Sequence, residues 1–375
     1  MYTLLSIAKA HHASDLHITV GVRPKCRISG TLYEMDGFEK LTPAMTKELV
    51  ESMFNEKQKK TMEATGEVDF AYTDTRVGRF RVNAFHQRGS YAAVLRIVAS
   101  DIPTPEDLGV PEAVLGLTKK KRGLVLVTGP TGSGKSTTLY TALNELNVEG
   151  VNIITVEDPV EANLNGVNQV QVNEKAGLTF SSALRSILRQ DPDIIMIGEI
   201  RDQETAEIAV KASITGHLVV STLHTNSSAN TITRLADMGV ENYLIADSVV
   251  GVIAQRLVRR VCPACGIVRE ATAGEKKILG IKDPARRINV RTPGHKECVR
   301  CGGTGYYGRI GIYEIMPVTA DLRQAINRGE NADVLEEIAL THGMKTLRMS
   351  AIDYALRGIT TVEEVQRVAY DDEDD

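Results

Sequence analysis

The hydrophobic residues of the first part of the chain, up to about Ser100, alternate with polar ones in short segments. This alternation predicts β-strands, at residues 25–35, 68–73, 78–87 and 91–98. The stretch 42–64 has a helical pattern, and Thr42 followed by Pro43 is typical of an N-cap and a first turn. Strands accompanied by one or two helices predict a small α+β domain over residues 1–100, with a mostly antiparallel sheet.

From Gly123 onward the pattern changes to continuous apolar runs that alternate with helical segments. The runs predict buried strands, at residues 124–128, 152–156, 193–198 and 217–224. Helices are expected between them, at 181–190 and 203–215. Asp202 is the expected N-cap of the second helix, and Gly216 follows its end. Because buried strands that alternate with helices are typical of a parallel sheet, the sequence predicts an α/β domain over residues 112–375. A proline-rich linker is expected at 101–111.

Length and composition indicate an ordinary soluble protein. The 375 residues are enough for two domains, and 42% hydrophobic with 25% charged residues is usual for globular chains. No apolar run reaches the roughly 18 residues of a membrane-spanning helix. The first residues also lack the basic and apolar regions of a signal peptide. We therefore expect a cytoplasmic protein.

The charge of the chain bears on its partners. A net charge of −4 disfavours binding along duplex nucleic acid, for which a domain is usually basic. The basic run at 119–122 is an exception, but so short a run is most simply a solvated turn before a strand. The acidic end at 371–375 is expected to be a solvated tail.

The segment GPTGSGKS, between a predicted strand and a predicted helix, matches the pattern G-x-x-x-x-G-K-[ST]. Its glycines let backbone N–H groups converge on phosphate oxygens, and the positive end of the helix dipole faces the same anion. Lys135 is expected to reach the β- and γ-phosphates, and the Ser136 hydroxyl to ligate Mg²⁺. The predicted nucleotide-binding residues are Gly129, Pro130, Thr131, Gly132, Ser133, Gly134, Lys135, Ser136 and Thr137.

Hydrolysis of a bound nucleotide also needs a carboxylate that holds the metal or positions water. Glu157 and Asp158 follow one predicted strand, and Glu199 follows the next. In an open parallel sheet these strand ends share an edge with the phosphate loop, which favours a functional role over simple helix caps. His217 and His224 bracket another strand, and their spacing of seven places them on opposite faces. They therefore do not form a metal pair, and a core or edge position remains an alternative for each.

Four of the five cysteines form two C-x-x-C pairs, Cys262 with Cys265 and Cys298 with Cys301, and 32 residues separate the pairs. Four thiolates in two knuckles suit tetrahedral zinc, and this pattern in a cytosolic chain favours metal over disulfides. Because no open position is offered, we expect a closed structural zinc site rather than a catalytic one. Cys26 stands alone and has no assigned role.

Four segments, in this order, closely resemble the sequence boxes of the secretion ATPases of type II secretion and type IV pilus systems: GPTGSGKSTTLY, VEDPVE, LRQDPDIIMIGEIRD and TGHLVVSTLHTN. The resemblance covers nearly the whole chain, since SDLHI at 14–18, RFRVNAF at 79–85 and the cysteine pairs also match. It implies a RecA-like P-loop ATPase domain after a small PAS-like α+β domain. It also implies a zinc element at about 259–311 and C-terminal helices at 318–370.

The resemblance assigns roles to individual residues. Lys135 and Ser136 match the residues that bind phosphate and Mg²⁺. Two acids match catalytic positions: Glu199 is the Walker B glutamate, which also ligates Mg²⁺, and Glu157 is the Asp-box acid near the γ-phosphate. His217 matches the first histidine of the His box, and the second is His224.

The resemblance also implies that the site is shared between subunits. The family is hexameric, and its nucleotide lies between the two domains near a neighbouring subunit, where arginines of the N-terminal domain complete the site. The matching arginines are Arg79, Arg81 and Arg96. Arginines that simply point outward from an amphipathic strand show the same periodicity, so the pattern leaves both roles open.

These features predict a cytoplasmic homo-hexameric ATPase, at the inner face of the cytoplasmic membrane, that uses ATP, Mg²⁺ and structural Zn²⁺. It would drive assembly of a type IV pilus or a type II secretion pseudopilus, with an inner-membrane platform protein as partner and no membrane contact of its own. The cysteine pairs are typical of extension and secretion members, whereas a start close to SDLH is typical of retraction members, so retraction is an alternative. A zinc ribbon also fits a nucleic-acid-translocating ring ATPase, which the acidic charge and 5% aromatic content disfavour. A binding module without turnover would have lost the acidic residues, and this chain retains them.

Overall fold

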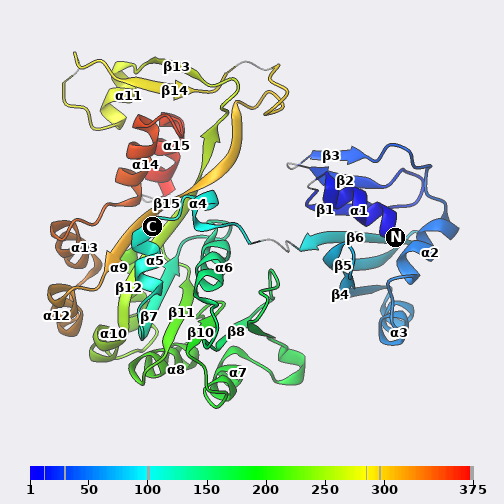
Figure 1. Cartoon of the computed structure of the whole chain (residues 1–375), viewed down its shortest axis with the longest axis horizontal. Helices are drawn as coiled ribbons and strands as arrows, with labels where there is room; N and C mark the ends of the chain where they lie inside the picture. Colours follow the sequence, from blue (N-terminus) through cyan, green and yellow to red (C-terminus); the bar gives the residue numbers. More distant parts are fainter. Residues whose placement is uncertain (12, 29–30, 99–101, 284, 295–296, 372–375) are drawn as a thin grey trace. The chain divides into compact units, whose positions relative to one another are not determined.

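The computed structural model describes residues 1–371 except 12, 29–30, 99–101, 284 and 295–296. It divides into two compact units (Figure 1). The first unit comprises Met1–Asp101 with Glu161–Asn163, and the second comprises Ile102–Val160 with Leu164–Asp375. Most of the acidic tail expected at 371–375 lies outside the described residues.

The first unit is an antiparallel sheet with helices. Its strand order is β3-β2-β1-β6-β5-β4, and every neighbouring pair is antiparallel. The strands are β1 Asp15–Ile18, β2 Lys25–Ile28, β3 Thr31–Glu34, β4 Glu67–Asp74, β5 Gly78–Gln87 and β6 Ser90–Val98. The helices are α1 Tyr2–Ala10, α2 Pro43–Glu51 and α3 Glu56–Thr65. The predicted α+β architecture is confirmed, whereas α1 and β1 were not predicted as elements.

The helical stretch predicted at 42–64 forms two helices, α2 and α3. Thr42 caps α2 by accepting the Met45 N–H, and Pro43 is its first residue, as predicted. A second start signal follows at Asn55, whose side chain accepts the Gln58 N–H while the Gln58 side chain accepts the Asn55 N–H. This reciprocal pair satisfies two N–H groups that a helix start leaves open, so the chain begins α3 there.

The second unit contains a largely parallel sheet. Its strand order is β15-β12-β7-β11-β10-β8-β9, with parallel pairing from β12 to β9 and an antiparallel pair of β12 with β15. The strands are β7 Gly123–Thr128, β8 Ile153–Glu157, β9 Asn168–Gln171, β10 Ile194–Ile197, β11 Leu218–Leu223, β12 Val249–Val261 and β15 Tyr306–Pro317. The predicted parallel α/β domain is confirmed, since β7, β8, β10 and β11 are fully buried strands with helices between them.

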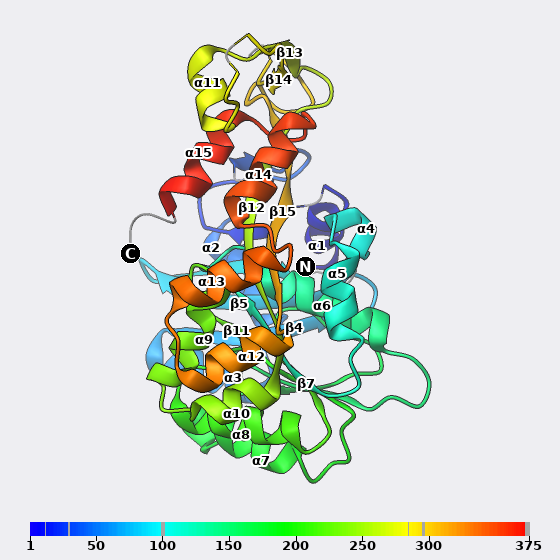
Figure 2. The same cartoon turned by 90° about the vertical axis from the view of Figure 1, so that its left-hand side faces the viewer.

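Helices connect and cover this sheet. They are α4 Pro105–Leu108, α5 Glu112–Thr118, α6 Lys135–Leu146, η1 Glu174–Ala176, α7 Phe180–Ile187, α8 Gln203–Ile214, α9 Ser228–Asp237, α10 Asn242–Ser248, α12 Ala320–Arg328, α13 Ala332–Thr341, α14 Leu347–Leu356 and α15 Val362–Asp371. Asp202 caps α8 as predicted, by accepting the Thr205 N–H. Figure 2 shows α9, α10, α12 and α13 gathered on one side, where their apolar faces share a core with the parallel strands.

The segment predicted as a linker at 101–111 is partly folded. It contains α4, which Thr104 caps, and α4 packs against α6 of the second unit. The Thr141 hydroxyl of α6 also donates to the Pro103 carbonyl oxygen at 2.9 Å. The chain is therefore fixed to the second unit from about residue 103.

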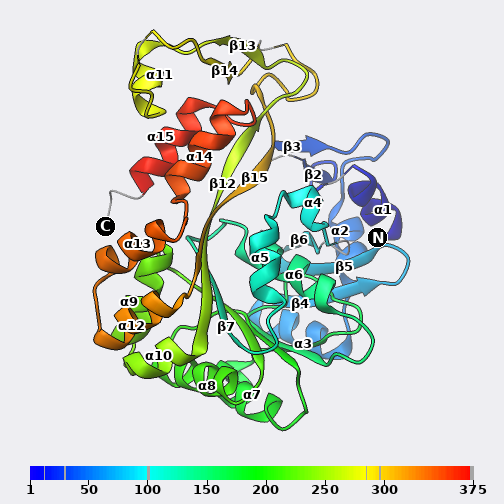
Figure 3. The ribbon, with the colours of Figure 1, turned by 60° about the vertical axis from the view of Figure 1, so that its left-hand side comes forward.

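A long ribbon of β12 and β15 was not predicted. The two strands have 13 and 12 residues and run side by side (Figure 3). Helices α14 and α15 pack on the ribbon through an apolar cluster that includes Val258, Leu347 and Val365. The ribbon leads to a small sheet of β13 Ile267–Glu270 and β14 Asn289–Thr292, with α11 Ala273–Ile278 between them in sequence. This small sheet lies within the predicted zinc element.

Candidate nucleotide-binding site

The phosphate loop joins β7 to α6 and lies against β12. A Cβ atom at Gly129, where φ is +147°, would lie 2.5 Å from the Gln255 carbonyl oxygen. A Cβ atom at Gly134, where φ is +90°, would lie 2.9 Å from Gln255 Nε2. Gly129 has no room for a side chain beside that backbone oxygen, and both residues have a positive φ that glycine adopts without strain. The loop can therefore turn tightly and gather its N–H groups at the amino end of α6, as a phosphate site requires.

The Lys135 ammonium lies over this loop. Its Nζ donates to the Gly129 carbonyl at 2.6 Å and to the Pro130 carbonyl at 3.1 Å, and the residue is 8% exposed. Burial lowers the pKa of Lys135 to about 8; nearby Glu199 raises it, and the Arg256 charge lowers it further. The lysine is therefore held by neutral carbonyls, and a phosphate would give it a charged acceptor.

The rest of the loop divides into exposed and buried groups. Pro130, Thr131, Gly132, Ser136 and Thr137 are exposed, so the predicted phosphate and Mg²⁺ ligands face solvent. The Ser133 hydroxyl oxygen, in contrast, is buried and has no hydrogen-bond partner within the part of the chain that the structure describes. An unsatisfied buried hydroxyl in a glycine loop fits a site that a polar ligand completes.

Glu199 lies directly after β10 and has charged partners. One carboxyl oxygen contacts the Arg201 guanidinium, and the other lies 3.4 Å from His224 Nε2. Arg201 is also 3.7 Å from the Asp158 carboxyl. Burial and the Lys135 charge lower the pKa of His224 and outweigh the opposite effect of Glu199. The His224 imidazole is therefore neutral at neutral pH and can donate one hydrogen bond.

Glu157, the last residue of β8, is in a different setting. It is 3% exposed, whereas the Glu199 side chain is 18% exposed. Its oxygens accept hydrogen bonds from uncharged donors, the Tyr140 and Thr155 hydroxyls and the Gln169 amide at 3.1 Å. Glu157 is therefore enclosed by the protein rather than directed to solvent.

The structure separates the two histidines of the predicted His box. His224 follows β11 at the edge of the sheet that carries the phosphate loop, and its pKa responds to Lys135. His217 precedes β11, and its carbonyl accepts the N–H of Gly123, the first residue of β7. The seven residue steps from His217 to His224, at about 3.3 Å each, place the two histidines roughly 23 Å apart. Within this chain, His217 is therefore at the opposite edge from the loop, and its ring contacts the Ala212 carbonyl at 3.0 Å.

The three predicted arginines lie on the sheet of the first unit. Arg79 and Arg81 alternate with the buried Phe80 along β5, and Arg81 is paired in register with Arg96 on β6. Arg96 donates through Nε to Asp15 at 2.9 Å. Burial disfavours the charged form of Asp15, but the hydrogen bonds from Arg96 and Ser14 outweigh it and lower the pKa of Asp15. Arg96 is therefore tied to the Asp15 carboxylate of the SDLHI segment.

Sequence analysis missed three residues around the site. Gln255 and Arg256 of β12 are 2% and 4% exposed and approach the loop from the side opposite to Glu199. Arg256 donates to the Asn226 side chain at 2.9 Å. Tyr140 of α6 bonds Glu157, as described above. The available signal for the first two was a pair of polar residues inside the apolar run VVGVIAQRLV.

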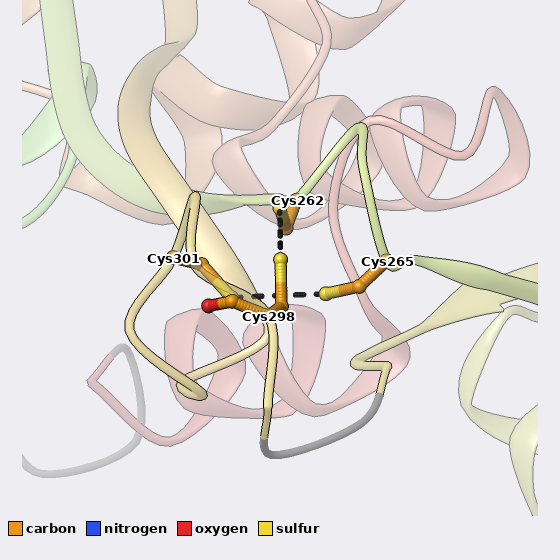
Figure 4. A group of neighbouring side chains, drawn as sticks. All are labelled: Cys262, Cys265, Cys298 and Cys301. Carbon is orange, nitrogen blue, oxygen red and sulfur yellow. Dashed lines mark hydrogen bonds between the residues drawn. The ribbon is translucent and has the colours of Figure 1, made fainter.

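The four paired cysteines come together at the end of the ribbon (Figure 4). Their sulfur atoms all lie within 4.8 Å of one another, with 3.9 Å between Cys262 and Cys298 and 3.7 Å between Cys265 and Cys301. All five cysteines of the chain are free thiols. Tetrahedral zinc with Zn–S bonds of about 2.3 Å needs sulfur separations of about 3.8 Å. The cluster therefore fits a closed four-thiolate site, and Cys26 is buried elsewhere, in the first unit.

None of the helices in the described part of the chain is both long and apolar enough to cross a lipid bilayer.

Comparison with known proteins gives consistent matches. The family model described as "Type II/IV secretion system protein" matches residues 5–367. The type IV pilus assembly ATPase PilB of Thermus thermophilus is 50% identical over 279 residues, which cover 73% of this chain and 31% of that protein. The type II secretion system protein E of Aeromonas hydrophila is 41% identical over 379 residues, which cover 98% of this chain and 75% of that protein. The chain thus spans only about a third of the length of the Thermus relative.

A solved structure resembles nearly the whole chain. The pilus retraction motor PilT with bound ADP is 34% identical, with a TM-score of 0.76 over 97% of this chain and 96% of that one. Since the family model covers most of the residues and the relatives exceed 40% identity, the chain belongs to the type II/IV secretion system protein family.

Proposed function

We propose that this protein hydrolyses ATP with Mg²⁺ and that a ring of identical subunits uses the energy to assemble a type IV pilus or a type II secretion pseudopilus. The observation that carries this proposal is the meeting of Lys135, Glu199 and His224 beside a glycine loop at one sheet edge. The similarity to a relative named as a type IV pilus assembly ATPase and to a type II secretion system protein E supports it.

The loop N–H groups and Lys135 bind the phosphates, and their positive charge stabilises the charge that develops during transfer. Ser136 and Glu199 would hold Mg²⁺, which would supply positive charge that neutralises phosphate oxygens. Glu199 orients the water that attacks the γ-phosphorus, and neutral His224 donates a hydrogen bond to the phosphate. The bond between the γ-phosphorus and the bridging oxygen breaks, so that water and ATP yield ADP, phosphate and a proton. Glu157 keeps the Asp-box segment in place from its buried position.

The first unit acts as the PAS-like domain that the resemblance implies, and it completes the site of a neighbouring subunit in a homo-hexamer. Arg79, Arg81 and Arg96 share one face of its sheet, which supports a role as a group. We assign His217 no direct contact with the nucleotide of its own subunit, because it lies at the far edge of the sheet.

The four cysteines hold one structural Zn²⁺, which the sulfur separations support. The protein works in the cytoplasm at the inner face of the membrane, and it attaches there through an inner-membrane platform protein rather than through nucleic acid or lipid. Retraction is the second candidate function, because the similarity to the retraction motor PilT covers 97% of this chain.

Phosphate release from purified protein with ATP and Mg²⁺ tests the proposal. Lys135→Ala should abolish nucleotide binding and turnover, because it removes the buried cation of the loop. Glu199→Gln should bind ATP normally and lower turnover by about 10²-fold or more. Glu204→Gln is a matched control, since Glu204 of α8 lies at the surface, where its carboxyl group pairs with Arg185 of α7. Wild-type turnover in Lys135→Ala would show that the activity does not come from this site.

A further inference from the structure

The buried carboxyl group of Glu157 is held by two different parts of the second unit. Its Oε2 accepts from the Tyr140 hydroxyl of α6. Its Oε1 accepts from the Thr155 hydroxyl of β8 and from Gln169 Nε2 of β9 at 3.1 Å. Oε2 is therefore bonded to the helix, and Oε1 is bonded to the strands.

The strand side of this arrangement is fixed by the backbone. The Leu164 N–H donates to Gln169 Oε1 at 2.8 Å, so the amide group of Gln169 is oriented with its NH₂ toward Glu157. Thr155 lies two residues before Glu157 on the same strand and is fully buried. Rotation of the Glu157 carboxyl would break these contacts, and the Tyr140 contact comes from outside the two strands.

Tyr140 belongs to the helix that begins at the phosphate loop. It follows Lys135, the first residue of α6, by five positions, and it is 4% exposed. Five residues of a helix span about 7.5 Å, so the phosphate-binding end of α6 and the Tyr140 ring move as one rigid piece. A change in the position of α6 when phosphate binds is therefore transmitted to Glu157 Oε2.

Glu157 in turn touches the backbone that carries the other acid. A Cβ atom at Gly198, the residue before Glu199, would lie 3.3 Å from the Glu157 Cα atom. Gly198 N–H also donates to the Val156 carbonyl at 2.8 Å. The backbone of Glu157 and the start of the Glu199 segment therefore lie side by side.

We propose that Tyr140 is a positioning residue, whose hydroxyl couples the phosphate-binding helix to Glu157 and so sets the acidic side of the site for turnover. This role rests on the proposed function, because it presupposes that the loop binds the phosphates of ATP. It concerns catalysis rather than affinity, since Tyr140 itself is buried behind the loop. Removing only the hydroxyl should lower kcat and leave the KM for ATP nearly unchanged.

Tyr140→Phe is the test, because it removes the hydroxyl and keeps the ring. We expect kcat to fall about tenfold, as small misplacements of catalytic groups do, with KM within about twofold of wild type. Thr155→Val removes a donor to the same carboxyl group without touching α6. It should also lower kcat and leave KM nearly unchanged. Tyr313→Phe is the matched control: Tyr313 is a 6%-exposed tyrosine of β15, and its hydroxyl lies near Thr138 of α6 rather than near an acid.

Tyr140→Phe and Thr155→Val each lose one buried hydrogen bond, so each should lower the thermal midpoint by about 2 to 4 °C. A fall in kcat for Tyr140→Phe and Thr155→Val with normal kcat for Tyr313→Phe supports the positioning role. Wild-type kcat in Tyr140→Phe, a change confined to KM, or equal losses in Tyr140→Phe and Tyr313→Phe would overturn it. Lys135→Ala tests the proposed function by itself. It should be inactive if the loop is the site of hydrolysis, whatever Tyr140→Phe shows.

Discussion

Replacing Glu364 by glutamine probes the junction that holds the last helix on the long ribbon. The Glu364 side chain is fully buried in the first turn of α15. It accepts the Arg259 backbone N–H at 2.7 Å, Arg259 Nε at 2.8 Å and Arg367 Nη2 at 3.0 Å. Since Arg259 lies on β12 three residues before Cys262, this one carboxyl group joins α15 to the ribbon beside the cysteine cluster.

The magnitude follows from these contacts. Glutamine keeps one acceptor oxygen but turns an NH₂ group toward donors, so at least one charge-assisted hydrogen bond is lost, each worth about 1.5–3 kcal/mol. The side chains of Arg259 and Arg367 are 44% and 50% exposed, so water can solvate them after the substitution. This limits the loss of stability. We expect a destabilisation of about 2 kcal/mol. Glu363→Gln makes the same chemical change at a side chain that is 69% exposed and 3.7 Å from Arg259, and it should cost about 0.5 kcal/mol or less.

The pH dependence gives the test a second readout. Burial disfavours the charged form of Glu364, but the Arg259 and Arg367 hydrogen bonds outweigh it and lower its pKa below the usual 4.5. Between the two pKa values the unfolded chain therefore binds more protons than the folded chain. The stabilisation by the ionised Glu364 is complete above about pH 4.5. It is lost as the pH falls from there through the pKa of the folded state. The gap between wild type and Glu364→Gln should narrow over the same range.

Hydrogen exchange of α15 and the thermal midpoint measure these effects. Glu364→Gln should speed exchange in α15 by roughly 30-fold, which is about 2 kcal/mol, while exchange in β7 and β11 stays unchanged. Equal behaviour of Glu364→Gln and Glu363→Gln, or a gap that stays constant with falling pH, would refute the reasoning.

Two further predictions concern other parts of the molecule. Arg79→Ala or Arg81→Ala should lower ATP turnover by orders of magnitude with little change in stability, as loss of an arginine finger does. Mixed rings with Lys135→Ala subunits should regain part of the activity, and no rescue in rings shown to be mixed would contradict sites completed in trans. Elemental analysis should find about one Zn²⁺ per chain. Cys262→Ser should lose it and loosen the ribbon end while ATP binding persists, whereas metal-free wild-type protein would contradict the closed site.

The parts of the fold that the sequence predicted correctly are those whose signals are local. The phosphate loop has fixed spacing, and its strand and helix follow from the residues on either side. Strands β8, β10 and β11 are apolar runs of buried residues, and Asp202 marks the start of α8 by its own hydrogen bond. In each case a few consecutive residues determine the element.

The ribbon of β12 and β15 could not be predicted in the same way, because its buried polar residues lie against distant parts of the chain. Gln255 is buried against Gly134 of the loop, and Arg256 bonds Asn226. Glu314 of β15 is buried as well, and its carboxyl group accepts the Ser228 N–H at the start of α9 at 2.7 Å. The sequence does not identify the partners of these residues, since they are 30 positions away for Arg256 and 86 positions away for Glu314.

The sequence also could not rank its two candidate acids, because both follow buried strands. The structure separates them by their partners. Glu199 contacts Arg201, which is 55% exposed and already within 3.7 Å of Asp158, so Arg201 can exchange one carboxyl group for the other at a cost of about 1 kcal/mol or less. Glu157 is bound by uncharged donors inside the protein. Breaking any one of these hydrogen bonds would leave a polar group unsatisfied, at a cost of about 1–3 kcal/mol. Glu199 is therefore the acid that is free to turn toward metal and water when nucleotide binds, whereas Glu157 is the acid whose orientation is fixed in advance.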